Sequence, residues 1–84
     1  MESLEDLRKS IDNIDNAIVA ILAERFKVTN RVGAYKASHN IPAKDPDREA
    51  LQHARIKELS QQYGLDPELA SSILDQVIAK VVAN

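Results

Sequence analysis

The sequence predicts an all-α protein in which one long helix and two short helices form an intertwined homodimer. Apolar residues recur with helical spacing along the first part of the chain, and an Asp-Pro pair, which is a helix start signal, occurs twice in the second part. No segment alternates apolar and polar residues in the way that a strand would. We expect a single domain that comprises residues 1–84.

The first expected helix begins at Leu4 and ends within residues 38–40. Its apolar positions alternate intervals of three and four residues over five heptads, and they are Leu4, Leu7, Ile11, Ile14, Ile18, Ile21, Val28, Val32 and Tyr35. Ser3 is a favourable N-cap, and the acidic residues after it suit the positive end of the helix dipole. Gly33 costs about 1 kcal/mol relative to alanine inside a helix, so we expect a packing reason for it, such as a close helix approach.

Two shorter helices are expected in the second part of the chain. One begins with Asp45 as N-cap and Pro46 at its first position, and it closes at Gly64. Asp66 and Pro67 repeat the start signal for a third helix, which we expect to continue to the C-terminus. Its broad apolar stripe comprises Leu69, Ile73, Leu74, Val77, Ile78, Val81 and Val82.

The long helix predicts a dimer. At about 1.5 Å per residue it would be about 50 Å long, whereas a compact chain of this length has a radius of gyration of about 12 Å. Two short helices can cover only part of its apolar seam, so a second copy is the natural partner. A chain this short also buries only about 60% of its unfolded surface, and without cysteine no disulfide supplements the core.

The composition excludes several classes of protein. Thirteen acidic residues against eleven basic ones argue against a nucleic-acid binder. There is no thiolate metal site, and the two histidines have no acidic neighbours at ligand spacing. No apolar run approaches the roughly 20 residues of a membrane span, and the N-terminus does not resemble a signal peptide. We therefore expect a cytoplasmic protein without a membrane partner.

One residue violates the heptad pattern of the long helix, because Arg25 takes an apolar seam position between Ile21 and Val28. It either sets the register as a polar seam residue or binds an anion in an apolar pocket. Lys36 lies about 20° away in rotation and about 16 Å further along, so it can face the same cavity. Alternatively, Lys36 only complements the C-terminal end of the helix dipole.

Arg8 can join these two residues only in a dimer. It lies about 25 Å from Arg25 along the same helix, which exceeds the reach of one small ligand. Two antiparallel long helices would bring the partner's Arg8 close to Arg25 and Lys36. On spacing alone, the alternative is a surface arginine paired with Asp12.

The first turn of the second helix carries a further charged group. Asp45 acts as N-cap in any case, whereas Arg48 and Glu49 either bind a ligand or are simply solvated. As adjacent residues their side chains diverge, so they would hold different parts of a ligand.

Three stretches of the chain, LRKSIDNIDNAIVAILAERF, VGAYK and IPAKDPDRE, together resemble the all-helical chorismate mutase family almost from end to end. The specific part is a combination of residues at the spacings of the family, namely Arg8, Arg25, Lys36, Asp45, Arg48 and Glu49. The resemblance implies an intertwined dimer with two equivalent pockets, each completed by the first helix of the other subunit. It also implies the substrate chorismate, which is converted to prephenate in aromatic amino-acid biosynthesis.

The resemblance also implies the role of each residue. Arg25 and the partner's Arg8 would bind the two carboxylates, and Lys36 would donate to the ether oxygen. Glu49, with the region of Asp45, would bind the ring hydroxyl. Such a Claisen rearrangement is unimolecular and needs no nucleophile, general base, metal or cofactor, so positioning and electrostatic stabilisation must suffice.

Two positions complete the comparison with the family. Arg48 would line and order the pocket. Val81 takes the place of a serine of the third helix, and the glutamine or glutamate that assists at the ether oxygen would fall beyond Asn84. A different group could serve there, or the natural chain could be longer, or activity could be low.

Two other functions remain open at this stage. An isochorismate-pyruvate lyase shares the fold, the arginines and the lysine, although Glu49 favours the mutase. A non-catalytic or regulatory helical dimerisation domain, fused to another enzyme of aromatic biosynthesis, would explain the missing group of the third helix.

Overall fold

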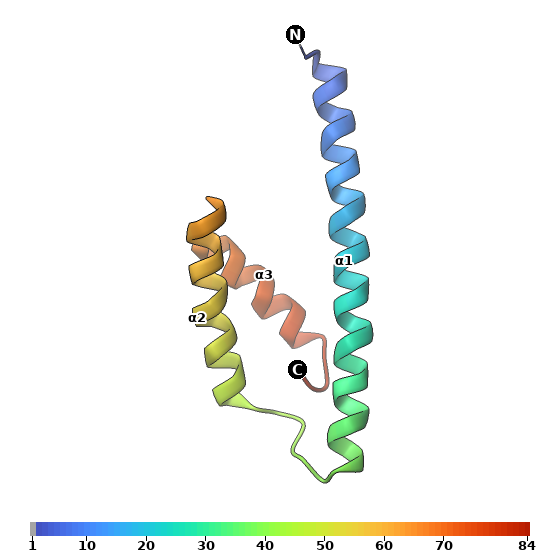
Figure 1. The fold of residues 1–84 in the computed structure, drawn as a ribbon, viewed down its shortest axis with the longest axis vertical. Helices are drawn as coiled ribbons and strands as arrows, with labels where there is room; N and C mark the ends of the chain where they lie inside the picture. Colours follow the sequence, from blue (N-terminus) through green and yellow to red (C-terminus); the bar gives the residue numbers. More distant parts are fainter. Residues whose placement is uncertain (1) are drawn as a thin grey trace.

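The computed structural model describes residues 2–84, and this part of the chain contains three helices and no strand. They are α1 (Leu4–Ser38), α2 (Pro46–Tyr63) and α3 (Pro67–Ala79). In Figure 1, α2 and α3 lie side by side, and the lower half of α1 lies beside them. The predicted all-α fold with one long and two short helices is confirmed.

The ends of α1 are held by local hydrogen bonds. Ser3 Oγ accepts from Asp6 N at 3.1 Å, and Ser3 N donates to the Asp6 carboxylate at 3.3 Å, which is a capping box. At the other end Asn40 has a φ of 55°, and Ile41 N donates to Lys36 O at 2.9 Å, as in a Schellman motif. The predicted bounds of the long helix are therefore confirmed.

The two short helices start as the Asp-Pro pairs predict. Asp45 accepts from Arg48 N at 3.1 Å, and Asp66 accepts from Glu68 N at 3.0 Å. Gly64 ends α2 in the left-handed conformation, with a φ of 71°. Each proline lies in the first turn, where it needs no hydrogen-bond acceptor.

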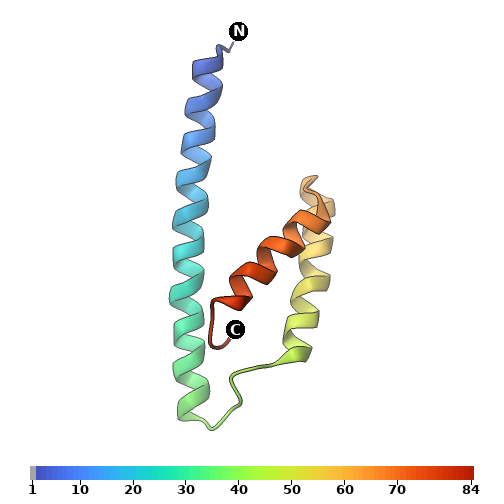
Figure 2. The same ribbon diagram turned by 180° about the vertical axis from the view of Figure 1, so that it is seen from behind.

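The expectation that the third helix reaches the C-terminus is wrong, because α3 ends at Ala79. The segment 80–84 turns away and runs along α1 instead (Figure 2). Val81 is the first of two adjacent β-branched residues with modest helix propensity, and Ala83 is buried to 2% exposure. A Cβ added at Gly33 would lie 3.9 Å from the Ala83 Cβ, so the close neighbour of this glycine is segment 80–84 rather than a helix.

Only α2 and α3 pack directly on each other. Their small core is formed by Ala70, Leu74 and Ile78, and His53 Nε2 contacts Asp75 Oδ1 at 2.6 Å across the pair. Within residues 2–84, no Cα atom of α1 lies within 8 Å of one in α2 or α3. The long helix is therefore joined to the pair through the connecting loop, segment 80–84 and long side chains.

The apolar seam of α1 is uncovered. Ile14 is 60% exposed and Ile21 69% exposed, and the N-terminal part of the helix extends beyond α2 and α3 (Figures 1 and 2). The radius of gyration is 16.3 Å, against about 12 Å for a compact chain of this length. In the described part of the chain, no helix combines the length and apolarity needed to cross a membrane.

Candidate active site

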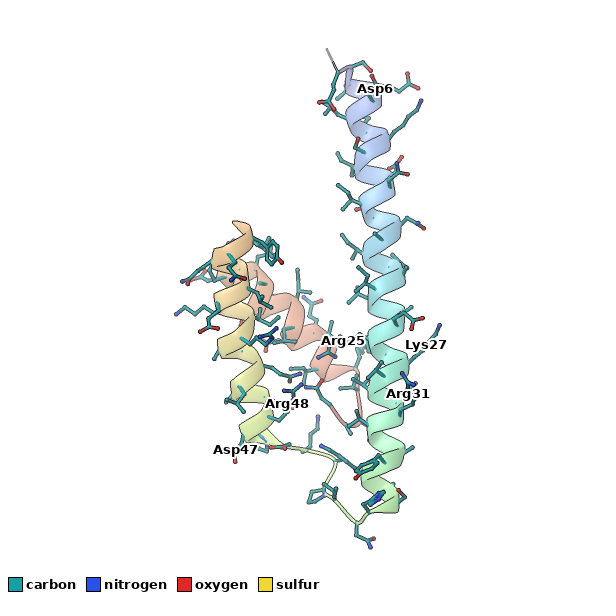
Figure 3. All side chains as sticks on the ribbon, viewed as in Figure 1. Asp6, Arg25, Lys27, Arg31, Asp47 and Arg48 are labelled. Carbon is teal, nitrogen blue, oxygen red and sulfur yellow. The ribbon has the colours of Figure 1, made fainter. Side chains whose placement is uncertain are left out.

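Arg25 projects from the middle of α1 toward the space between α1 and α2, whereas Lys27 and Arg31 point away from it (Figure 3). Its guanidinium group is partly buried. Nη2 donates to Asn84 Oδ1 at 2.9 Å, but Nη1 is buried and has no hydrogen-bond partner within residues 2–84. A buried cationic donor without a partner is costly, so this atom marks a place where an acceptor is favoured.

Arg25 lines a hollow of about 480 Å³ between α1, α2 and α3. Its lining residues are Arg25, Arg48, Leu51, Gln52, Arg55, Ile56 and Leu74. Arg48 and Arg55 form no ion pair with any residue of the described chain, and no carboxylate lines the hollow. Three arginines without a neutralising acid favour an anionic ligand.

A second hollow of about 300 Å³ adjoins the first and is almost entirely apolar. The two share Arg25, Ile56 and Leu74. Its other lining residues are Leu22, Leu59, Ser60, Tyr63, Leu65, Ala70, Ile73 and Val77. Arg25 therefore stands between a cationic hollow and an apolar one.

Three of the predicted site residues, Lys36, Asp45 and Glu49, line neither hollow. Lys36 Nζ donates to Ala43 O at 3.2 Å, which ties the end of α1 to the loop before α2. Asp45 acts as the N-cap of α2. Glu49 is partly buried in the first turn of α2, and its carbonyl oxygen contacts His53 Nδ1 at 3.1 Å.

The other two predicted residues lie elsewhere. Arg8 is exposed near the start of α1, about 25 Å from Arg25 along the helix. Val81 is partly buried in the segment after α3. Of the seven predicted site residues, a single chain thus brings only Arg25 and Arg48 into one hollow.

Three polar residues of this site were not predicted from the sequence. Gln52 and Arg55 follow Arg48 at intervals of four and seven, so they share its face of α2, and this spacing could have been noticed. Asn84 has no comparable signal, because it reaches Arg25 only through the turn of the segment after α3.

The sequence of the chain matches a known protein family. Residues 7–84 match the model of the family "Chorismate mutase type II". The chain belongs to this family.

Characterised relatives cover nearly the whole chain. It is 35% identical to the chorismate mutase of Methanocaldococcus jannaschii over 93% of this chain and 79% of that protein. It is 33% identical to the T-protein of Haemophilus influenzae over 100% of this chain but only 22% of that protein. It is also 29% identical to a 4-amino-4-deoxychorismate mutase of Streptomyces pristinaespiralis, over 94% of this chain and 61% of that protein. Family members thus occur both as small proteins and as parts of much longer ones.

Proposed function

We propose that this chain is a chorismate mutase that converts chorismate to prephenate in aromatic amino-acid biosynthesis, as a cytoplasmic homodimer of the single domain 1–84. The observation that carries the proposal is the buried, unpartnered Nη1 atom of Arg25 in an arginine-lined hollow of a chorismate mutase type II chain. The name of the relative from Methanocaldococcus jannaschii supports the same activity.

Positioning and charge would supply the catalysis. A guanidinium group binds both oxygens of a carboxylate, so arginines that hold the two carboxylates of chorismate select the conformer in which the bond-forming carbons meet. A cation near the ether oxygen stabilises the negative charge that develops as the C–O bond breaks. Arg25 would bind one carboxylate, and Arg48 would order the hollow. Lys36 would give up its hydrogen bond to Ala43 O and donate to the ether oxygen instead.

In the proposed dimer, the other subunit completes each pocket. The exposed seam of α1 and the apolar hollow beside Arg25 both need apolar cover. The N-terminal part of a second α1, which extends beyond its own α2 and α3, has the apolar residues and the length to supply it. Antiparallel packing of two long helices would then bring the partner's Arg8 toward Arg25. Glu49, with the region of Asp45, would bind the ring hydroxyl, and Val81 would line the pocket.

The activity is tested with purified protein and chorismate. We expect the absorbance of chorismate to fall with enzyme concentration, and NMR of the products to show prephenate. A parallel reaction with isochorismate should release no pyruvate, which separates the mutase from a lyase. A folded protein that leaves chorismate unchanged would contradict the proposal and favour a regulatory dimerisation domain.

The dimer is a separate prediction. Because several large apolar side chains of α1 are about half exposed or more, we expect sedimentation equilibrium at micromolar concentration to give twice the chain mass. Dilution should cause dissociation and loss of helix signal together, since the monomer leaves the seam uncovered. A stable, fully helical monomer at micromolar concentration would be inconsistent with the proposed assembly.

A further inference from the structure

Arg25, Asn84 and Gln52 form a chain of hydrogen bonds that joins three parts of the fold. Arg25 Nη2, from α1, donates to Asn84 Oδ1 at 2.9 Å, and Asn84 Nδ2 donates to Gln52 Oε1 on α2. Arg25 and Gln52 are partly buried and line the same hollow. Asn84, the middle residue of these hydrogen bonds, belongs to segment 80–84, which was expected to be helical and is not.

The direction of each bond is determined by the arginine. A guanidinium group only donates, so the oxygen of the Asn84 amide must face Arg25 and its nitrogen must face away. This nitrogen also only donates, so Gln52 must turn its oxygen toward Asn84. The Gln52 Nε2 group therefore remains as a donor, and it has no partner within residues 2–84.

The polar groups that line the hollow would then all be donors. Arg25 Nη1, the guanidinium groups of Arg48 and Arg55, and the Gln52 amide nitrogen can each meet an acceptor, and no carboxylate opposes them. If the Gln52 amide were reversed, its oxygen would face the same ligand, which would replace an attraction to an anion by a repulsion.

We propose that Gln52 is a further substrate-binding residue, which donates through Nε2 to an oxygen of the bound dicarboxylate, and that Asn84 is the positioning residue that orients its amide. This rests on the proposed function in one respect, because the dicarboxylate is taken to be chorismate. Asn84 acts through Gln52 and Arg25, while Gln52 touches the ligand.

Three variants test the roles in turnover. Gln52→Met keeps the length of the side chain but removes the donor, so the KM for chorismate should rise about tenfold with a smaller change in kcat. Asn84→Asp removes the donor that faces Gln52, so the glutamine amide can reverse, and KM should rise as well. Gln61→Met makes the same chemical change at an exposed position of α2 and should leave KM unchanged.

The combination of the two site variants distinguishes positioning from general damage. Gln52→Met removes the Gln52 donor, and Asn84→Asp lets the same donor turn away from the ligand. The rise in KM of the double variant should therefore be smaller than the product of the two single effects. The changes in thermal midpoint, measured by circular dichroism, should not show this dependence of one substitution on the other. Multiplicative effects on KM, or an unchanged KM in Gln52→Met, would overturn the proposal.

A binding measurement makes the test independent of turnover. Malonate, a small dicarboxylate, is added to 15N-labelled wild-type protein, and the side-chain amide resonances of Gln52 should shift while those of Gln61 should not. If chorismate is not converted but Gln52 shifts with malonate, the proposed function fails and the donor role remains. If malonate shifts backbone resonances of the hollow but not the Gln52 amide, or shifts nothing, the donor role is wrong.

Discussion

Replacing Arg25 by alanine should lower kcat/KM for chorismate at least about 100-fold, a loss of about 2.7 kcal/mol of transition-state stabilisation. The variant loses a charge-assisted contact in a partly desolvated site, where Nη1 has no other partner in the described part of the chain. Steady-state kinetics measure the effect. The matched control is Arg31→Ala, since Arg31 lies on the same helix but points away from the hollow (Figure 3).

The stability of Arg25→Ala should change little. The variant loses the hydrogen bond to Asn84, which is worth about 2 kcal/mol, but it also removes a buried cationic donor that has no partner within residues 2–84. Thermal melting therefore shows whether a loss of activity in Arg25→Ala comes from unfolding, and catalysis together with oligomeric state separates the two possible roles of this residue. Intact catalysis together with an altered oligomeric state would mean that Arg25 is a register device of the seam and not a ligand for the substrate.

Mixing two inactive variants should restore about a quarter of the wild-type activity. The variants are Arg8→Ala and Arg25→Ala, each nearly inactive as a homodimer if every pocket needs Arg25 of one chain and Arg8 of the partner subunit. After joint refolding, about half of the dimers are mixed. In a mixed dimer one pocket lacks both arginines and the other retains both, so half of its sites are active. Chorismate turnover by the refolded mixture gives the measurement.

A second mixture provides the control for this experiment. Arg25 and Arg48 line one hollow within a single chain, so mixed dimers of Arg25→Ala and Arg48→Ala contain no intact pocket and should recover nothing. Mass spectrometry verifies that mixed dimers form in both cases. If the first mixture also recovers nothing, although mixed dimers are present, Arg8 and Arg25 do not meet across the interface.

The candidate site could be predicted only in part. Arg25 is identified because it interrupts an otherwise apolar seam, and Arg48 through the resemblance to the chorismate mutase family; the structure brings both to one hollow. Lys36 and Arg8 could be placed on α1 but not with a ligand, since Lys36 donates to a loop carbonyl and the proposed role of Arg8 requires a second subunit. Gln52 lies one turn after Arg48 on α2, and this spacing is a local signal, but its link to Arg25 runs through Asn84 and has no local pattern.

The sequence by itself determined the three helices, their caps and the family. The helices and their caps depend on interactions between residues within a few positions of one another: an N-cap and its first turn, a left-handed residue at a helix end, and an apolar spacing. Tertiary contacts decided where α3 ends. No glycine or proline marks Ala79, and the chain turns there because contacts more than forty residues away in the sequence, of Ala83 with Gly33 and of Asn84 with Arg25, compete with further helix.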